Sequence, residues 1–271
     1  MVWKAAVDFL YPPFCLVCGR DLPEGGGLVC EPCWERARRE NRASFFIGDG
    51  GVFRDPGGNR MYGRSANRWN EPLGEILHRF KYGAYPSLGE RLALQLAATV
   101  LADPKLRGAD LLVPAPLTRA RRRERGYNQS AILARRLSEL TGIPSGGEGV
   151  RRRGRSRSQT KLDAEERRRN VRGVFRVTRP DLFAGRRVVI VDDVITTGAT
   201  AWELALVLAK AGAAEVSVLA VAKAAGRSSS RSSSTPGSSD GRGGRGPSAA
   251  KTFRWMTGLW RGHGGSTPSP P

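Results

Sequence analysis

Apolar and polar positions follow two different periods along the middle of the chain. The segments in which apolar residues recur at helical spacing are 71–85, 87–103, 128–142 and 200–212. The segments that form short, nearly continuous apolar runs, typical of buried strands, are 109–117, 173–177, 186–193 and 214–222. Strands that alternate with helices and are apolar on both faces indicate a parallel sheet covered by helices on both sides. The pattern therefore predicts an α/β fold.

The ends of the predicted elements carry local signals of their own. Gly83 and Pro86 separate the first two helices, and Gly142 follows the third as a stop signal. Asp163 and Glu166 form a capping box, which predicts a further helix start. Periodicity and turn chemistry thus agree on where these elements begin and end.

Composition divides the chain into three parts. Residues 1–40 hold all four cysteines, residues 41–223 carry the alternating pattern, and residues 224–271 are rich in Gly, Ser, Arg and Pro. The last part cannot bury enough apolar area to offset its chain entropy, so we expect a disordered tail. That tail has one apolar island, with Phe253 and Trp260 at its ends.

Two further features bear on location and partners. No apolar run reaches the roughly 18 residues of a membrane-spanning helix, and we identify no secretory signal, so we expect a cytoplasmic protein. The net charge of +20 indicates either an anion-binding role or a solvated basic surface. The basic run 151–170 has no aromatic residue, which disfavours a single-stranded DNA groove built from that run alone.

The cysteines form two Cys-x-x-Cys pairs at a spacing typical of zinc sites. Cys15 and Cys18 make the first pair, and Cys30 and Cys33 make the second. Four thiolates complete a tetrahedral zinc site and leave no open position for catalysis, so the expected role is structural. Disulfides or buried free thiols are the alternatives, and the lack of a secretory signal favours zinc.

A second cluster of candidate residues follows the apolar run 188–191. Asp192 and Asp193 come directly after it, and we expect them to emerge at the carboxyl end of a buried strand, where ligands bind in open α/β sheets. Carboxylates accept hydrogen bonds from a sugar diol, and a turn before a helix attracts a phosphate. A ribose 5-phosphate has both groups. The turn residues that would hold its phosphate are Thr196, Thr197, Gly198, Ala199 and Thr200.

Residues 188–200, VVIVDDVITTGAT, closely resemble the phosphoribosyl pyrophosphate (PRPP) motif of type I phosphoribosyltransferases. A Walker B strand also ends in acids, but the sequence has no GxxxxGK[ST] loop. A response-regulator receiver would need a full domain downstream, and a purely structural strand–turn–helix remains the simplest alternative.

Residues 11–223 as a whole resemble the ComF family. The motifs that carry this resemblance occur in order: CLVCG, CEPC, FKYG, VPAPL, RERGYNQ, SQTKLDAEERRRN, GVF and the PRPP motif. The family joins an N-terminal zinc finger to a phosphoribosyltransferase-like domain and is tied to natural competence for DNA uptake. The segment 47–69 and the tail depart from its pattern, which leaves the entry into the domain open.

The resemblance implies a type I phosphoribosyltransferase-like sheet that binds PRPP with Mg²⁺, and it implies a loop for the pyrophosphate. The matching segment here contains Thr118, Arg119 and Arg125, which are our candidates for that role, although arginines facing solvent are the plain alternative. Tyr127 and Asn128, in a segment that could cover the site, are candidates for contacts with a base, although Tyr127 is equally suited to the core. Lys81 is a further candidate anion ligand.

Two functions follow from the resemblance and the charge. In the first, a nitrogen nucleophile attacks the ribose C1 of PRPP and pyrophosphate leaves. In the second, the protein handles single-stranded DNA for the competence uptake machinery, or senses PRPP, without turnover. The chain turns to Gly, Ser and Arg directly after Lys223, with no element that would select a base. The sequence leaves the acceptor base and the oligomeric state open.

Overall fold

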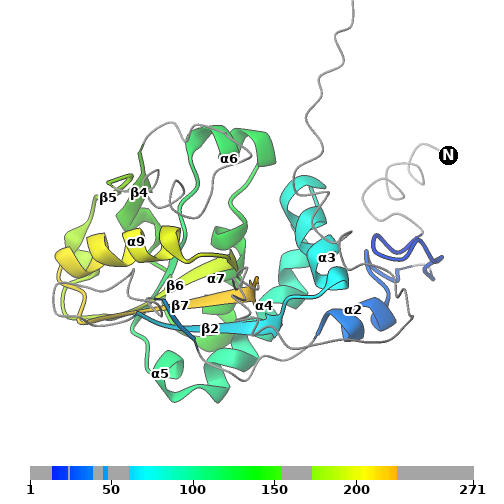
Figure 1. Cartoon of the computed structure of the whole chain (residues 1–271), viewed down its shortest axis with the longest axis horizontal. Helices are drawn as coiled ribbons and strands as arrows, with labels where there is room; N and C mark the ends of the chain where they lie inside the picture. Colours follow the sequence, from blue (N-terminus) through cyan, green and yellow to red (C-terminus); the bar gives the residue numbers. More distant parts are fainter. Residues whose placement is uncertain (1–13, 24, 39–44, 48–60, 154–172, 225–271) are drawn as a thin grey trace, which may run out of the picture.

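The structure is a computed structural model and describes residues 14–23, 25–38, 45–47, 61–153 and 173–224 (Figure 1). The predicted tail from residue 225 on, with its apolar island, and the predicted capping box lie outside these residues. The prediction of an α/β fold is confirmed, because a mostly parallel sheet has helices on both faces.

The central sheet has five strands in the order β1-β2-β7-β6-β3. Their bounds are β1 Phe45–Ile47, β2 Met61–Arg68, β3 Leu111–Pro114, β6 Arg187–Ile195 and β7 Glu215–Lys223. β1 pairs antiparallel with β2, whereas the pairs β2–β7, β7–β6 and β6–β3 are parallel. The four parallel strands therefore end at the same edge of the sheet.

Strand β6 shows why the sheet is buried on both faces. Val189 and Val191 belong to one apolar cluster, whereas Val188 and Ile190 belong to the other. Because successive side chains of a strand point to opposite faces, a continuous apolar run supplies both clusters at once. This explains the unbroken run that the sequence has at 188–191.

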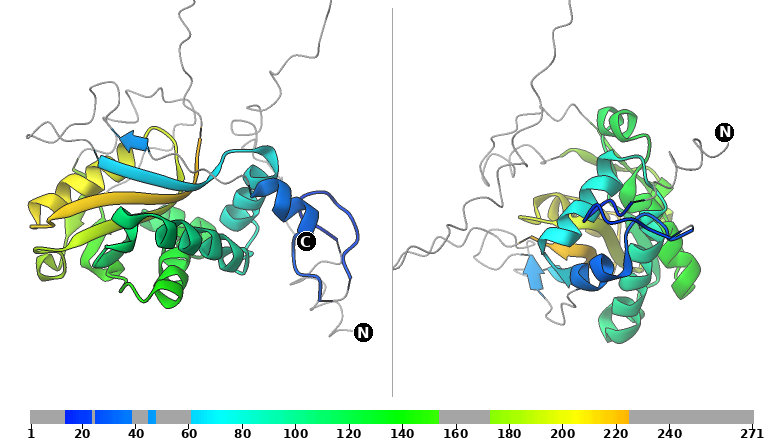
Figure 2. Two further views of the ribbon diagram at one scale, coloured as in Figure 1. Left: turned by 90° about the horizontal axis from the view of Figure 1, so that it is seen from below. Right: turned by 90° about the vertical axis from the view of Figure 1, so that its right-hand side faces the viewer.

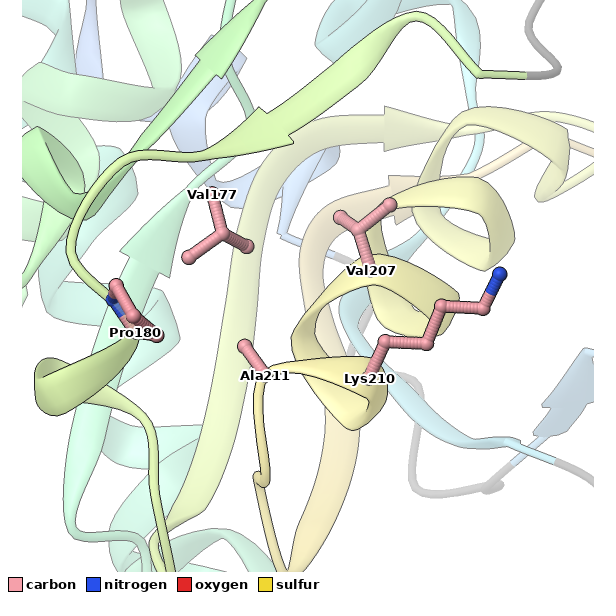
Figure 3. A pocket seen from close by; sticks show the side chains of 5 residues that line it. All are labelled: Val177, Pro180, Val207, Lys210 and Ala211. Carbon is pink, nitrogen blue, oxygen red and sulfur yellow. The ribbon is translucent and has the colours of Figure 1, made fainter.

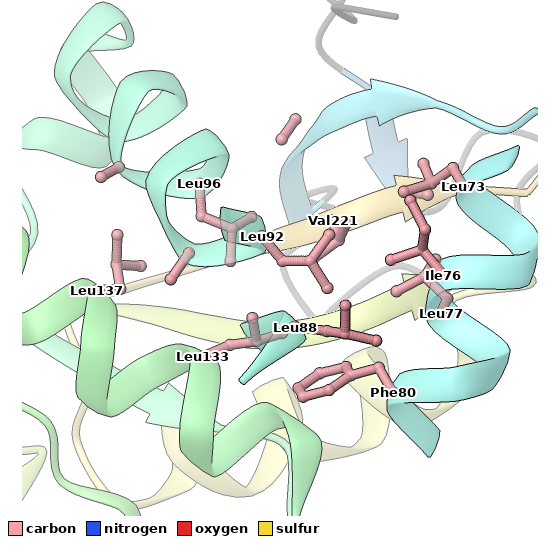
Figure 4. Packing of buried hydrophobic residues seen from close by; sticks show 14 of the residues in the cluster. Leu73, Ile76, Leu77, Phe80, Leu88, Leu92, Leu96, Leu133, Leu137 and Val221 are labelled. Atoms are coloured by element: carbon pink, nitrogen blue, oxygen red, sulfur yellow. The ribbon is translucent and has the colours of Figure 1, made fainter. Parts of the chain in front are cut away.

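Helices cover the two faces unequally (Figure 2). The helices on the first face are α3 Glu71–Tyr82, α4 Leu88–Ala102, α5 Pro104–Arg107 and α7 Gln129–Thr141. Leucines of α3, α4 and α7 meet Val221 of β7 in the larger cluster (Figure 4). The second face is covered by α9, Ala199–Lys210, through Leu204 and Leu208. Gly142 ends α7 with a φ of 74°, which confirms the predicted stop signal.

Three elements differ from the sequence prediction. The segment 61–68, left open above, forms β2 and pairs in parallel with β7. The predicted strand in 173–177 is β5, Phe175–Val177, but it lies outside the central sheet and pairs antiparallel with β4, Val150–Arg152. Residues 119–125, expected as a loop, form helix α6, Arg119–Arg125. Short 3₁₀ turns, η1 at Gly147–Gly149 and η2 at Pro180–Leu182, precede β4 and follow β5.

The cysteine-rich region packs directly on α3 and α4. Its helix α2, Glu31–Ala37, buries Trp34 in the larger apolar cluster. Both carboxylate oxygens of Glu31 accept hydrogen bonds of 2.6 Å from the Arg91 guanidinium, which also lies 4.9 Å from the Trp34 ring. Asn70 caps α3 and donates a 3.0 Å bond to the Ala37 carbonyl. The cysteine-rich region is therefore attached to the sheet domain through a shared core.

Within the described part of the chain, no helix is both long enough and apolar enough to cross a membrane.

Candidate active site

The acid pair, Asp192 and Asp193, lies in the last part of strand β6. Asp192 is in register with Ala220 of β7, and the pairing continues to Ile195. The strand predicted over 186–193 therefore extends two residues further, to Ile195. The ladder continues because β7 extends to Lys223 and supplies partners beyond the acids. The acids still lie near the carboxyl edge of the parallel sheet, where ligands bind in such folds.

Asp193 has a cationic partner inside the protein. The Lys81 Nζ lies 3.1 Å from a carboxylate oxygen of Asp193, and both side chains are largely buried. Lys81 is in the last turn of α3, so packing of α3 on the sheet brings the ammonium group to the acid. The candidate anion ligand predicted at Lys81 is thus paired with a carboxylate in this structure.

Asp192 has hydrogen-bond donors but shares its surroundings with a second acid. The Ser130 hydroxyl donates to it at 3.0 Å, and the backbone N–H of Asp193 donates at 2.9 Å. Burial, and then the charge of Asp193, raise the pKa of Asp192 to about 7. Lys81 opposes this rise. Ser130 was missed by sequence reasoning because a serine at the start of an amphipathic helix also suits a cap.

The turn after β6 packs closely against Ile47 of β1. Gly198 has a φ of 79°, and a Cβ there would lie 2.8 Å from the side chain of Ile47. As the N-cap of α9 it offers no side-chain acceptor to the helix, while the Thr197 hydroxyl accepts a long 3.4 Å bond from the Ala199 N–H. Thr196 is exposed and Thr200 partly exposed at the same turn. This arrangement leaves the positive end of α9 available to an anion.

The arginine-rich segment is helical. Thr118 is buried and caps α6, where its hydroxyl accepts a 3.2 Å bond from the Arg121 N–H. Arg119 opens the helix and is exposed. Arg125 donates to Gln129 at 3.0 Å and to the Tyr82 hydroxyl at 3.1 Å, with its guanidinium 4.9 Å from the Tyr82 ring. The candidates for the pyrophosphate role therefore lie on a helix, not in the loop expected from the sequence.

Tyr127 and Asn128 have partners within the protein. The Tyr127 hydroxyl donates to the Phe80 carbonyl, and its ring packs against the larger apolar cluster. Asn128 caps α7 by accepting from the Ser130 N–H at 3.1 Å, and it donates to the Ala115 carbonyl at 3.1 Å. In this structure both side chains hold the segment between α6 and α7 in place and do not project their polar groups freely.

The cysteine cluster has the geometry of a tetrahedral metal site. The sulfurs of Cys15, Cys18, Cys30 and Cys33 all lie within 4.8 Å of one another, and those of Cys18 and Cys30 are 3.7 Å apart. Zinc–sulfur bonds of about 2.3 Å place sulfurs about 3.8 Å apart, so the residues fit the ion.

Hydrogen bonds to two of the sulfurs support the same fit. The N–H groups of Val17 and Cys30 donate to Cys15 Sγ at 3.4 and 3.3 Å, and Arg36 donates to Cys33 Sγ at 3.1 Å. Burial acts to raise the pKa of Cys15, but these backbone donors outweigh it and bring the pKa down to about 6. The four cysteines could therefore bind zinc as a structural ion.

A separate shallow cavity of about 280 Å³ lies between β5, η2 and α9 (Figure 3). Its lining residues are Val177, Pro180, Val207, Lys210 and Ala211. Lys210 and Ala211 are at the carboxyl end of α9, whereas the 196–200 turn precedes its other end. The cavity therefore lies toward the opposite end of α9 from that turn and is not part of the acid site.

Two domain families match the chain. The double zinc ribbon domain matches residues 6–43, and the phosphoribosyl transferase domain matches residues 124–239. The first match covers the cysteine cluster, and the second covers the acid pair and the turn before α9. The N-terminal zinc ribbon and the phosphoribosyltransferase-like sheet expected above are thereby confirmed.

Several relatives are similar over long stretches. Competence protein F of Haemophilus influenzae is 35% identical over 222 residues, which cover 78% of this chain and 85% of that protein. The DNA utilization protein YhgH of Escherichia coli is 36% identical over 54% of this chain and 65% of that protein. Competence protein ComFC of Bacillus subtilis is 28% identical over 69% of this chain and 67% of that protein.

Among solved structures, a glutamine PRPP amidotransferase from B. subtilis is similar over 51% of this chain and 26% of that one. The identity there is 26% and the TM-score 0.36.

Proposed function

The chain belongs to the competence protein F (ComF) family, and we propose that its acid site binds PRPP together with Mg²⁺. The observation that carries the proposal is the acid pair beside an open helix N-terminus. Asp192 and Asp193 lie near the carboxyl edge of the sheet, and Gly198 at the N-cap leaves the first turn of α9 without a side-chain cap. The carboxylates would accept bonds from the ribose hydroxyls, and the turn would hold the 5-phosphate.

The remaining parts of the proposed site have distinct tasks. Thr118, Arg119 and Arg125 would lie toward the pyrophosphate, and Tyr127 and Asn128 would hold the neighbouring segment in place. Mg²⁺ prefers oxygen ligands and would be held by the phosphates with help from the acid pair. We also propose a division into a zinc module, 1–40, a phosphoribosyltransferase-like domain, 41–223, and a tail, 224–271.

For catalysis we propose transfer of the phosphoribosyl group to a nitrogenous base. The base nitrogen forms a bond with the ribose C1 as the bond from C1 to the pyrophosphate oxygen breaks, and pyrophosphate leaves. The protein would contribute mainly by positioning and by charge, with the acid pair on the ribose and cations on the leaving group. Lys81 would pair with the Asp193 carboxylate and orient it for this role.

The test is a calorimetric titration with PRPP and Mg²⁺. Asp192→Asn should weaken PRPP binding by about tenfold or more, because a charge-assisted bond to the ribose is lost. Asp181→Asn, which removes an exposed acid paired with Arg179, should leave binding within about twofold. Wild-type protein that fails to bind PRPP, or an Asp192 variant that binds normally, would refute the proposal. Release of pyrophosphate with a panel of bases then separates catalysis from sensing.

A second candidate function, binding of single-stranded DNA, is favoured by one observation. Tyr82 is 53% exposed, and Arg125 stacks on it at one end of the arginine-rich helix α6. Exposed aromatic rings beside cations are the features that bind single strands. Tyr82→Ala should weaken binding of a fluorescent oligonucleotide, and affinity should fall steeply with salt. Leu94→Ala, at another exposed apolar position, is the control. Salt-independent binding, or equal effects of both variants, would argue against this function.

A further inference from the structure

The four cysteines of the metal site differ in their access to solvent. Cys18 is exposed and Cys30 is partly exposed. Cys15 and Cys33, in contrast, are 1% and 0% exposed and lie in the larger apolar cluster. A reagent dissolved in water therefore reaches the sulfur of Cys18 before it reaches the two sulfurs in the core.

Hydrogen bonds reinforce this difference. The backbone N–H groups of Val17 and Cys30 donate to the sulfur of Cys15 at 3.4 and 3.3 Å. The Arg36 guanidinium donates to the sulfur of Cys33 at 3.1 Å. A hydrogen bond to a thiolate occupies a lone pair that could otherwise attack an electrophile. The two buried sulfurs are therefore protected by donors as well as by burial.

The exposed sulfur of Cys18 has a second sulfur beside it. The Sγ atoms of Cys18 and Cys30 are 3.7 Å apart, and a disulfide requires them to approach to about 2 Å. Gly19, directly after Cys18, has a φ of 71° and open space around it, so the backbone can adjust there. Redox-sensitive cysteines are typically accessible and have a second cysteine nearby that resolves the oxidised form. Cys18 and Cys30 have this arrangement.

We propose that Cys18 is an oxidation site, and that hydrogen peroxide converts Cys18 and Cys30 to a disulfide with release of zinc. The Cys18 thiolate attacks one peroxide oxygen, the O–O bond breaks, and hydroxide leaves as a sulfenic acid forms. The Cys30 thiolate then attacks the sulfenic sulfur, the S–O bond breaks, and a second hydroxide leaves as the disulfide forms. The two sulfurs together lose two electrons, and the peroxide gains them.

Oxidation of this pair would affect more than the metal site. Two thiolates remain of the four that complete a tetrahedral zinc site, so the ion is no longer held. The helix α2 of this region packs on α3, and Asn70 at the start of α3 donates to the Ala37 carbonyl at 3.0 Å. Loss of zinc would therefore weaken the support of α3, whose last turn carries Lys81. The inference rests on zinc binding by the cysteines and does not require PRPP binding.

The experiment treats the zinc-loaded full chain with hydrogen peroxide and follows released zinc with a colorimetric chelator. Mass spectrometry then maps disulfides after free thiols have been blocked. We expect zinc release together with a Cys18–Cys30 disulfide, and a dithiol reductant with added Zn²⁺ should restore the site. In samples without peroxide, N-ethylmaleimide should modify Cys18 at least about tenfold faster than Cys15 or Cys33.

Two histidine variants separate the roles of the two sulfurs, because histidine can ligate zinc but cannot form a disulfide. Cys18→His should slow zinc release by peroxide by about tenfold or more. Cys30→His should leave Cys18 reactive, so that a dimedone probe traps its sulfenic acid. If Cys18→His does not retain zinc, the alkylation rates and the disulfide map of the wild type decide.

Four results would overturn the inference. The first is a disulfide of the wild type between Cys15 and Cys18 or between Cys30 and Cys33, and the second is zinc release from Cys18→His at the wild-type rate. The others are wild-type protein that holds no zinc and wild-type protein that retains zinc in peroxide. None of these results bears on the proposed binding of PRPP, which is titrated separately under reducing conditions.

Discussion

The acid pair and the cysteine cluster each place several acidic side chains close together, but the protein compensates their negative charge in different ways. Asp193 has Lys81 at 3.1 Å, and Asp192 accepts from Ser130 and from a backbone N–H. In the cysteine cluster, four sulfurs lie within 4.8 Å, and the nearest cation is the Arg36 guanidinium, which donates to one of them. In the first group the chain itself supplies a cation and hydrogen-bond donors, whereas in the second a metal ion would supply most of the compensating charge.

Burial sharpens this difference. Cys33 is 0% exposed and burial raises the pKa of its thiol to about 12, so zinc has to displace its proton. Cys15 and Cys33 also belong to the same apolar cluster as Leu73 and Phe80 of α3. Metal binding is therefore expected to stabilise the core that positions α3. The acid pair lies at the edge of the sheet, where a ligand can replace the partners that the protein provides.

Zinc removal should have the largest effect. Chelation, or Cys33→Ser, should lower the free energy of unfolding by about 5 kcal/mol or more, because structural zinc supplies folding energy and Cys33 is in the core. Thermal unfolding followed by circular dichroism measures the loss, and elemental analysis should find one zinc per chain. After chelation of the wild-type protein, added Zn²⁺ should restore its stability and added Mg²⁺ should not. If the purified protein contains no zinc and chelators do not change its stability, the cysteine cluster does not depend on a metal ion, and the comparison with the acid pair fails.

The second largest effect should follow from loss of the internal cation of the acid site. Lys81→Met leaves Asp193, which is 7% exposed, without its partner, and should lower the free energy of unfolding by about 3 kcal/mol at neutral pH. Urea titration measures the change. Lys210→Met, at an exposed lysine on α9, should change stability by less than about 0.5 kcal/mol.

The double variant Lys81→Met/Asp193→Asn should recover part of the loss, because it removes both charges. A double variant that is as unstable as the sum of its two single variants would show that the pair is not coupled. In that case Lys81 would not compensate the negative charge of the acid pair.

Sequence periodicity was sufficient to predict the helices and strands that carry apolar residues at regular spacing. Helices α4 and α7 and strands β6 and β7 lie where the pattern predicts them, because packing on the sheet selects the same faces that the periods mark. Strand β2 was missed because it buries polar residues. Its Asn67 is 1% exposed, and its side-chain amide donates to Gln95 at 2.6 Å and to the Val221 carbonyl at 3.3 Å. Such a strand cannot be identified without its tertiary partners.

The acid site was predictable only in part for a similar reason. The order of residues in 188–200 marks the acids and the turn, because a strand, two carboxylates and a glycine turn are adjacent in the chain. The contacts of Lys81 and Ser130 with the acids, in contrast, depend on how α3 and α7 pack on the sheet.

The smallest effect should be a change in the pH dependence of stability at Asp192. Its pKa is raised from the ordinary value of about 4 to about 7, so between these pH values the folded state binds more protons than the unfolded state. Ionisation of Asp192 therefore lowers the free energy of unfolding progressively as the pH rises from about 4 to about 7. Above pH 7 this destabilisation is complete. Asp192→Asn removes this slope and should be more stable than wild type at pH 8 by about 1–2 kcal/mol. Urea titrations at pH 5 and pH 8 measure the difference.

The control for this last prediction is an acid whose pKa moves in the opposite direction. The Arg179 guanidinium lowers the pKa of the exposed Asp181, which is therefore ionised at both pH values, so Asp181→Asn should give no gain at pH 8 over pH 5. An Asp192→Asn variant that shows the same lack of gain would mean that Asp192 is ionised throughout this range. Lys81 and Ser130 would then balance both carboxylates of the acid pair, and the contrast with the cysteine cluster would be greater than proposed here.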